Sequence, residues 1–269
     1  MVNERIIGMP TSMMNWLASP PGQYLLNWEQ RWLDEAVADM FGFHALQLGL
    51  GQIEALRSNR MPQRWLADAD AQVQSVALHC DFDALPFPNQ SLDLVVLPHA
   101  LELAHDPHDS LREVERVLRP EGRVVITGFN PSSLWGLRQR GGRLRRRVGL
   151  SGPLFLPAEG EFIGYRRVRD WLRLLGFEVE QGQFGCWRPP LSSQAWLERM
   201  AWLDRVGEHA WPVLGAVYMV AAVKRVRGMR LVGLAHRRRA LHPVVPATVA
   251  NRAPSPSSAS AVQPTAEIE

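Results

Sequence analysis

The chain has 269 residues, of which 46% are hydrophobic, so it can bury one substantial core with room for one appendage. Its formal net charge of +3 is too small to indicate a nucleic-acid partner. Cys80 and Cys186 stand far apart and lack the spacing of metal ligands. The composition therefore excludes a disulfide framework, predicts no metal site and favours a reducing compartment.

Neither the amino terminus nor the longest apolar run indicates export or a membrane span. The opening "MVNERIIGMPTSMMNW" has no basic region followed by a continuous apolar stretch, so we expect no signal peptide. The run "VLGAVYMVAAV" from Val213 is too short to cross a bilayer and predicts a buried strand. We expect a soluble, cytoplasmic protein without membrane insertion, and the oligomeric state stays open.

The first predicted element is an amphipathic helix over about residues 23–40, closed by Gly42. The "PPG" at residues 20–22 is expected to break the chain before it, and residues 1–41 form an amino-terminal helical segment. The apolar positions that repeat every four residues along this helix are Trp28, Trp32, Ala36 and Met40.

Strands and helices then alternate, which predicts a parallel sheet flanked by helices over residues 42–226. Asp106 caps one helix, with Pro107 in its first turn. Residues 227–269 are basic and then rich in Pro, Ser and Ala, so we predict a disordered tail. The other predicted elements are strands at 44–50, 92–97, 123–129 and 215–224, a helix then a strand over 166–184, and a tryptophan-bearing helix over 193–209.

The segment "LQLGLG" and the fifty residues from "DFDALPFPNQSLDLVV" to "VVITGFN" resemble class I S-adenosylmethionine-dependent methyltransferases of the type-11 group. The resemblance is strongest over Asp81–Asn130. It implies an α/β fold, with a seven-stranded, mostly parallel, Rossmann-like sheet and helices on both faces. It also implies that the last strand, here Gly215–Lys224, is antiparallel and that S-adenosylmethionine is the cofactor.

The glycine pair Gly49 and Gly51 follows the first strand, at the edge where parallel sheets bind ligands, and lets backbone approach a ligand closely. The family places an acid at Gln47 and a third glycine at Ile53. Exchanging a charged for a neutral hydrogen bond costs about 1 kcal/mol, which weakens cofactor binding without abolishing it. The resemblance implies an altered but functional cofactor loop; the alternative is a tight turn that binds nothing.

Two acids and one aromatic residue complete the implied cofactor site. By the resemblance, the Asp81 carboxylate accepts a hydrogen bond from the adenine amino group, and Phe82 offers backbone and an apolar face. Asp68 or Asp70 accepts hydrogen bonds from the ribose hydroxyls. The alternative for Asp81 is a carboxylate that caps local amides, and an exposed turn acid is equally consistent with the sequence near Asp68.

His99 follows the strand that ends in "VVLP" and is the predicted catalytic residue, level with the methyl group. A histidine there can orient the substrate, hold a water or take a proton near neutral pH. It is equally consistent with a structural histidine whose hydrogen bonds are satisfied. Gln23 and Tyr24 are expected to cover the pocket, and "NPSS" from Asn130 is consistent with a helix-capping turn.

The resemblance predicts methyl transfer to a small molecule with an oxygen or carbon nucleophile. The sequence has "LPHA" where amino-group methyltransferases often carry an Asn/Asp-Pro-Pro-aromatic motif, and no cysteine lies where a cytosine-carbon mechanism needs one. One alternative is a non-catalytic binding module with the same fold. The other is a nucleic-acid methyltransferase that uses the arginine-rich loop "RQRGGRLRRR" from Arg138.

Overall fold

The computed structural model describes residues 11–69, 76–150, 154–157 and 160–225. These residues belong to one compact unit, Met1–Gly228. The segment 227–269, predicted to be a basic and then disordered tail, lies outside the described residues, as does Asp70. None of the helices in the described part of the chain combines the length and apolar character that a membrane crossing requires.

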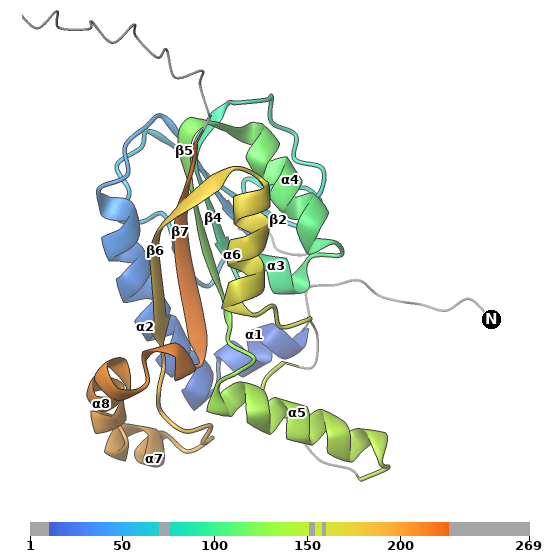
Figure 1. Ribbon diagram of the computed structural model, residues 1–269, viewed down its shortest axis with the longest axis vertical. Coiled ribbons are helices and arrows are strands. Elements are labelled where there is room, and N and C mark those ends of the chain that lie inside the picture. Colours follow the sequence, from blue (N-terminus) through green and yellow to red (C-terminus); the bar gives the residue numbers. More distant parts are fainter. Residues whose placement is uncertain (1–10, 70–75, 151–153, 158–159, 226–269) are drawn as a thin grey trace, which may run out of the picture. The chain divides into compact units, whose positions relative to one another are not determined.

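A seven-stranded sheet forms the middle layer, in the order β3-β2-β1-β4-β5-β7-β6 (Figure 1). Strands β1 to β5 pair in parallel with one another, whereas β7 runs antiparallel to both β5 and β6. The predicted fold class is confirmed, with the last strand of the chain inserted between β5 and β6. The strands are β1 (His44–Leu48), β2 (Gln63–Asp68), β3 (Leu78–His79), β4 (Leu92–Pro98), β5 (Leu118–Phe129), β6 (Phe177–Gly185) and β7 (Val217–Lys224).

Helices cover both faces of the sheet (Figure 1). One apolar cluster joins the sheet to α1, α2 and the segment after β1; a second joins its other face to α3, α4 and α6. The helices are α1 (Thr11–Leu17), α2 (Pro20–Ala38), α3 (Ala100–Leu103), α4 (Pro107–Val117), α5 (Leu134–Arg147), α6 (Tyr165–Leu174), α7 (Gln194–Arg199) and α8 (Trp202–Ala210), with the 3-10 turn η1 (Pro212–Leu214).

Strand β7 shows why the apolar runs of this chain form a middle layer. All eight of its residues are buried, and successive side chains point to opposite faces of the sheet. Met219 packs in the cluster with α1 and α2, whereas Tyr218 and Val220 pack in the cluster with α4 and α6. A strand covered on both faces is continuously hydrophobic, as the sequence of this segment is.

Three local predictions about helices are wrong. Pro20 and Pro21 form the first turn of α2 and do not break the chain, because a first-turn proline lacks only an amide that has no partner in the helix. The arginine-rich segment is helix α5, not a loop. Its N-cap Ser133 accepts a hydrogen bond from the amide of Gly136 at 3.1 Å, and its arginines and leucines are strong helix formers. The tryptophan-bearing helix is divided into α7 and α8.

The connection from β1 to β2 positions the candidate site. Residues 49–62, all of which the structure describes, form turns and no helix. Leu50, Ile53 and Leu56 from this segment pack into the same apolar cluster as α1 and α2. The glycine loop is therefore held against the amino-terminal helices.

Candidate functional site

The carboxyl ends of four adjacent strands carry most of the predicted site residues. In the sheet order β3-β2-β1-β4, Asp81 follows β3, Asp68 ends β2, Gly49 follows β1 and His99 follows β4. Parallel strands present these ends along one edge of the sheet, which is where open α/β sheets bind ligands. The fold thus brings residues that are up to fifty positions apart in the sequence to one edge.

The glycine loop is tightly turned at its start. Gly49 has a φ of 74° and Leu50 a φ of 46°, so two successive residues lie in the left-handed region. That conformation costs a non-glycine residue free energy and persists only where the surroundings hold it. The amide of Gly49 donates to the carbonyl of Ala67 on β2 at 2.7 Å, which fixes the loop to the neighbouring strand.

The side chain of Gln47 is buried inside this loop. Its Nε2 donates to the carbonyl oxygens of Gly49 at 3.2 Å, Leu50 at 3.2 Å and Ile53 at 2.7 Å. Its Oε1 accepts from the amide of Ala55 at 3.0 Å. Both ends of the amide are thus used by the loop, and the three donated bonds require an NH₂ group that a carboxylate lacks.

Ile53, at the place of the family's third glycine, is also buried. It packs in the apolar cluster that contains Met13 and Leu17 of α1. A glycine at this position would leave a gap beneath the amino-terminal helices. Gln47 and Ile53 together give the loop an internal hydrogen-bond network and an apolar contact in place of an open turn.

Both predicted acids lie near Cys80. Asp68 is fully buried, whereas Asp81 is exposed. Burial raises the pKa of the Cys80 thiol to about 11, and the carboxylates of Asp81 and Asp68 add to that shift. The amide of Cys80, the residue before Asp81, donates to the carbonyl of Asp68 at 3.1 Å, so the two predicted acids stand at the ends of paired strands. Phe82 is buried in the apolar cluster with α3 and α4, so its ring contacts the core.

His99 is fully buried between two glutamates. Its Nδ1 lies 2.8 Å from Oε2 of Glu102, and its Nε2 lies 2.8 Å from Oε1 of Glu29 on α2. The other oxygen of Glu102 accepts from the amide of Phe129 at 2.6 Å. His99 has a φ of 52°, and its amide donates to the carbonyl of Thr127 at 3.1 Å. Both ring nitrogens are thus bound to carboxylates.

Burial by itself lowers the pKa of His99, but the charges of Glu29 and Glu102 more than offset it and raise this pKa to about 10. The ring is therefore a cation at neutral pH. Burial raises the pKa of Glu102, which the adjacent imidazolium opposes. The arrangement is a buried cation held between two carboxyl groups, and a ring in this state does not take up a proton near pH 7.

Sequence reasoning did not find Glu29, the residue that ties α2 to His99. Its position contained a signal, because Glu29 lies four residues after Leu25 and four before Leu33, on the buried face of α2. A carboxylate on an apolar helix face requires a polar partner in the core.

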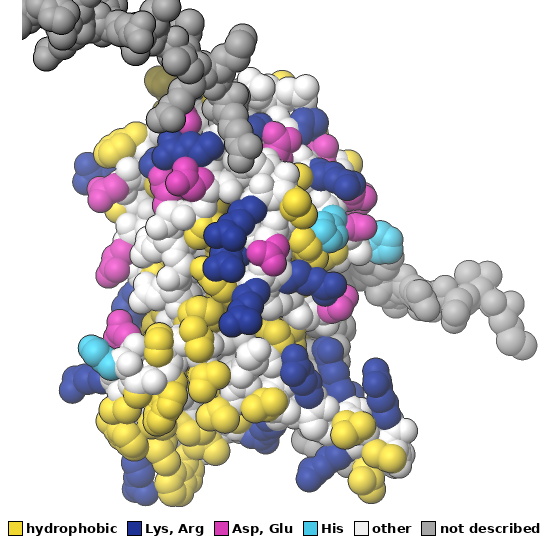
Figure 2. Space-filling view, viewed as in Figure 1, with side chains coloured by type: hydrophobic (Ala, Val, Ile, Leu, Met, Phe, Trp, Pro, Cys, Tyr) yellow, Lys and Arg dark blue, Asp and Glu magenta, His cyan; other side chains and the backbone are white. Residues whose placement is uncertain are grey.

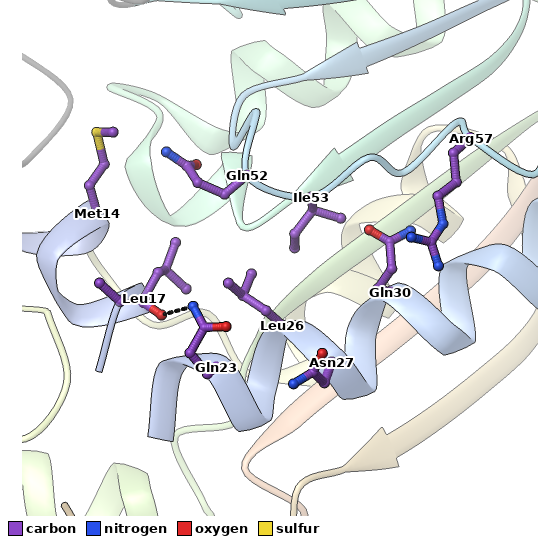
Figure 3. Close-up of a pocket in the computed structure, with 10 residues that line it drawn as sticks. Met14, Leu17, Gln23, Leu26, Asn27, Gln30, Gln52, Ile53 and Arg57 are labelled. Carbon is purple, nitrogen blue, oxygen red and sulfur yellow. Dashed lines mark hydrogen bonds between the residues drawn. The ribbon is translucent and has the colours of Figure 1, made fainter. Parts of the chain in front are cut away.

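A cavity of about 520 Å³ lies between the glycine loop and the amino-terminal helices. Figure 3 shows Gln52 and Ile53 on the loop facing Gln23, Leu26 and other side chains of α2. Its volume is in the range of small-molecule sites. None of the residues predicted to bind the cofactor is among those that line it. The lining residues are Met14, Leu17, Ala18, Gln23, Leu26, Asn27, Gln30, Gln52, Ile53 and Arg57.

Three further polar residues from the sequence have defined places. Gln23 lines the cavity, and its Nε2 donates to the carbonyl of Leu17 at 3.0 Å. Tyr24 instead donates its hydroxyl to Asp204 on α8. Asn130 lies in the turn that leads into α5. Its side-chain amide donates to the carbonyls of Val213 and Gly215, both at 2.9 Å.

The residues at this edge fit the adenosine part of S-adenosylmethionine. Asp68 and Asp81 can accept hydrogen bonds from hydroxyl and amino groups, and the glycines allow close approach of backbone. At the methionine part the neutral Gln47 replaces the expected acid and is occupied within the loop. Among the described residues, no group of three or more His, Cys, Asp or Glu side chains is placed to hold a metal ion.

Comparison with known proteins matches the segment of the chain that forms this edge of the sheet. The family model described as "Methyltransferase domain" matches residues 50–126, which run from the glycine loop into β5. Among solved structures, a Haloferax volcanii methyltransferase in complex with the activator Trm112 superposes with a TM-score of 0.51 at 19% identity, covering 81% of this chain and 97% of that one. A SAM-dependent methyltransferase of Thermotoga maritima gives 0.51 at 14% identity, covering 75% and 92%. Residues 50–126 thus match the methyltransferase domain family, and the fold of the chain is that of these solved methyltransferases.

Among curated proteins, YafS of Escherichia coli is 34% identical over 164 residues, which are 61% of this chain and 65% of YafS. Malonyl-[acyl-carrier protein] O-methyltransferase of Halorhodospira halophila is 36% identical over 95 residues, 35% of this chain and 29% of that protein. The quinone C-methyltransferase UbiE of Hahella chejuensis is 44% identical over 48 residues, 18% and 19% of the two chains. The matches span less than two thirds of each of these relatives.

Proposed function

We propose that this chain is an S-adenosylmethionine-dependent methyltransferase whose acceptor is a small molecule with an oxygen or carbon nucleophile. The proposal rests on one observation. Gly49, Asp68 and Asp81 lie at the carboxyl ends of three adjacent parallel strands, beside or within the matched methyltransferase segment. Residues 42–226 would form the methyltransferase domain, and residues 1–41 its amino-terminal helical segment. The protein would act in the cytoplasm.

When bound, the cofactor supplies a methyl group on a positively charged sulfur, which is already a good leaving group. The chain's task is then to bind and align, and alignment alone can contribute ~7–11 kcal/mol to lowering the barrier. Asp81 would accept from the adenine amino group, Asp68 from the ribose hydroxyls, and Gly49 and Gly51 would allow the methionine part to approach the backbone. Phe82 would contribute its backbone, since its ring is buried.

Gln47 and His99 have more indirect roles in this proposal. Gln47 would set the shape of the loop through its four hydrogen bonds. His99, the predicted catalytic residue, would act indirectly by holding α2 against the end of β4, because both of its ring nitrogens are bonded to Glu29 and Glu102. A cation bound to Glu29 and Glu102 does not act as a general base at neutral pH.

The relatives support the acceptor class. One is a malonyl-[acyl-carrier protein] O-methyltransferase and another a C-methyltransferase of ubiquinone and menaquinone biosynthesis. Both names describe transfer to oxygen or carbon, which agrees with the sequence, where the motif typical of amino-group methylation is absent after β4.

A second candidate, a non-catalytic module with the methyltransferase fold, is favoured by one specific observation. The amide of Gln47 and both nitrogens of His99 are bonded within the protein, so two of the predicted site residues have no free hydrogen-bonding group for a ligand in this conformation. A module of this kind would keep the sheet and the loop but transfer no methyl group.

Isothermal titration calorimetry with S-adenosylmethionine and S-adenosylhomocysteine separates a chain that binds the cofactor from one that keeps only the fold. The proposal expects saturable binding of both compounds by the full chain, and competition between them. If neither compound binds to protein that melts cooperatively, the cofactor assignment is wrong and the non-catalytic module is favoured. Asp81→Ala should weaken this binding. Its matched control is Asp83→Ala, which removes an exposed acid two residues away.

A further inference from the structure

Helix α5 exposes an apolar stripe that the proposed methyl transfer does not require. Leu134, Leu137, Leu144 and Val148 fall within about 80° of one another around the axis at 3.6 residues per turn. All four are exposed, by 54% to 71%. The opposite face of the helix carries the buried residues, including Trp135, which donates to the carbonyl of Arg188 at 2.7 Å. The helix is thus anchored by one face and presents its leucines to solvent.

Arginines flank this stripe on both sides. At the same helical spacing, Arg138 and Arg145 lie on one side of the leucines, and Arg140 and Arg147 on the other. The 14 residues of α5 include six arginines and no acid. An apolar stripe bordered by cations is the pattern of a helix that lies in the plane of a membrane interface.

A second exposed apolar group lies at the same end of the sheet. It comprises side chains of α7, α8 and η1, and its three tryptophans are 49% to 57% exposed. Figure 2 shows hydrophobic side chains gathered at the lower left, where Figure 1 draws α7 and α8, and basic and hydrophobic side chains at the lower right, over α5. The members of this group are Trp196, Trp202, Val206, Trp211, Val213 and Leu214.

The two groups are linked through one segment. Arg138 on α5 donates to the carbonyl of Pro190, and Arg188 pairs with Asp204 on α8 at 2.9 Å. α5 follows β5, and α7 and α8 follow β6, so this surface adjoins the sheet edge that carries the candidate site. The exposed leucines and tryptophans and the α5 arginines are called the lower face below.

We propose that the lower face docks on an anionic lipid bilayer. Tryptophan rings prefer the boundary between hydrocarbon and water, where one end of the ring is apolar and the other is hydrated. The arginines complement anionic headgroups. A second copy of this chain is a poorer occupant, because it would bring two α5 helices of like charge together. Nucleic acid would use the arginines but would leave the leucine stripe in water.

Docking of this kind is peripheral and agrees with the finding that no described helix can cross a membrane. It also presents the carboxyl edge of the sheet to the bilayer. An acceptor that partitions into lipid could then reach the site without crossing water. The docking itself does not depend on the proposed methyl transfer.

Vesicle co-sedimentation of the full chain, without cofactor, tests the proposal. We expect binding to vesicles that mix phosphatidylcholine with phosphatidylglycerol, weaker binding to phosphatidylcholine alone, and a decrease with added salt. Leu137→Gln combined with Leu144→Gln should weaken binding at least roughly ten-fold, because apolar area no longer leaves water. Arg140→Glu combined with Arg147→Glu should weaken it by roughly five-fold per arginine or more.

The matched control combines Leu174→Gln with Arg173→Glu on α6, since both side chains are exposed and lie outside the lower face. This variant should bind vesicles as the parent does. Every variant keeps the arginines of residues 227–269, so a loss of vesicle binding by the α5 variants is assigned to α5. Substitution of exposed residues should leave thermal melting unchanged, which checks that each variant is folded.

Four outcomes would overturn the proposal. The parent fails to bind mixed vesicles at low salt, or the leucine variant binds them as tightly as the parent. Alternatively, light scattering finds a dimer of the parent that the leucine variant dissociates without any vesicle binding. Finally, a duplex oligonucleotide binds through the arginines with no effect of the leucines and no vesicle binding. Calorimetry with S-adenosylhomocysteine remains a separate readout of the proposed function.

Discussion

The Nε2 atom of His99 lies 2.8 Å from Oε1 of Glu29, although the two residues are 70 positions apart in the chain. This contact connects the middle of α2 to the carboxyl end of β4, where the candidate site begins. The amino-terminal helices therefore share a buried charged group with the sheet. They are part of the structure that shapes the site.

Replacing Glu29 by leucine should strongly destabilise the protein. The change removes one acceptor of the buried imidazolium and leaves its N–H without a partner, at a cost of about 3–5 kcal/mol. Glu29→Gln keeps an acceptor oxygen and should cost less. Urea denaturation at pH 7 measures both, with Glu35→Leu as the matched control, because Glu35 is exposed on the same helix. Equal stability of Glu29→Leu and the parent would contradict the buried pair.

The stability of the protein should fall as pH rises from neutral toward 10. The pKa of His99 is raised from 6.5 to about 10 in the folded chain, so the folded state holds this proton more tightly than the unfolded state. Its contribution is fully present below pH 6.5 and is lost as pH rises through the folded pKa. The slope is up to about 1.4 kcal/mol per pH unit between the two values.

His99→Gln removes the titrating group and should flatten this part of the stability curve. The measurement is the free energy of unfolding from urea titrations at several pH values between 7 and 10, for parent and variant. A parent curve as flat as that of the variant would mean that His99 is not charged in the folded protein. An NMR titration of the imidazole would give the same pKa directly.

Gln47→Glu should destabilise the glycine loop even though the family carries an acid at this position. The carboxylate cannot donate to the three carbonyl oxygens that Nε2 contacts, and the loss of three hydrogen bonds should cost about 2–4 kcal/mol. Differential scanning calorimetry measures the effect, with Gln52→Glu as control, since Gln52 is exposed in the same loop. Unchanged stability with tighter binding of S-adenosylhomocysteine would show that the loop accepts the acid.

Asp81→Ala should weaken S-adenosylhomocysteine binding by roughly ten- to a hundred-fold, because the adenine amine loses a charged acceptor. Asp81→Asn keeps an acceptor oxygen and should fall between the parent and the alanine variant. Asp83→Ala should have a smaller effect, and thermal melts show whether each variant is folded. If the parent binds and Asp81→Ala binds equally well, this residue does not contact the adenine.

The fold class and the approximate positions of many helices and strands could be predicted from the sequence. Predicted Leu92–Leu97 is β4, which ends one residue later, and the predicted last strand begins at Val217 and is antiparallel. Asp106 caps α4 as expected, accepting from His108 at 2.8 Å. Buried strands and helix caps depend on patterns within a few neighbouring residues, so they can be predicted from the chain alone.

The contacts of the side chains at the site could not be predicted in this way. The sequence placed Gln47 and His99 next to strand ends, but their hydrogen bonds go to a loop that folds back and to a helix far away in the chain. The exposure of Leu137 and Leu144 on α5 is likewise decided by which helix face Trp135 anchors. Hydrogen-bond partners and burial depend on what the folded chain brings into contact across long sequence separations, and a residue's own identity and spacing do not contain that information.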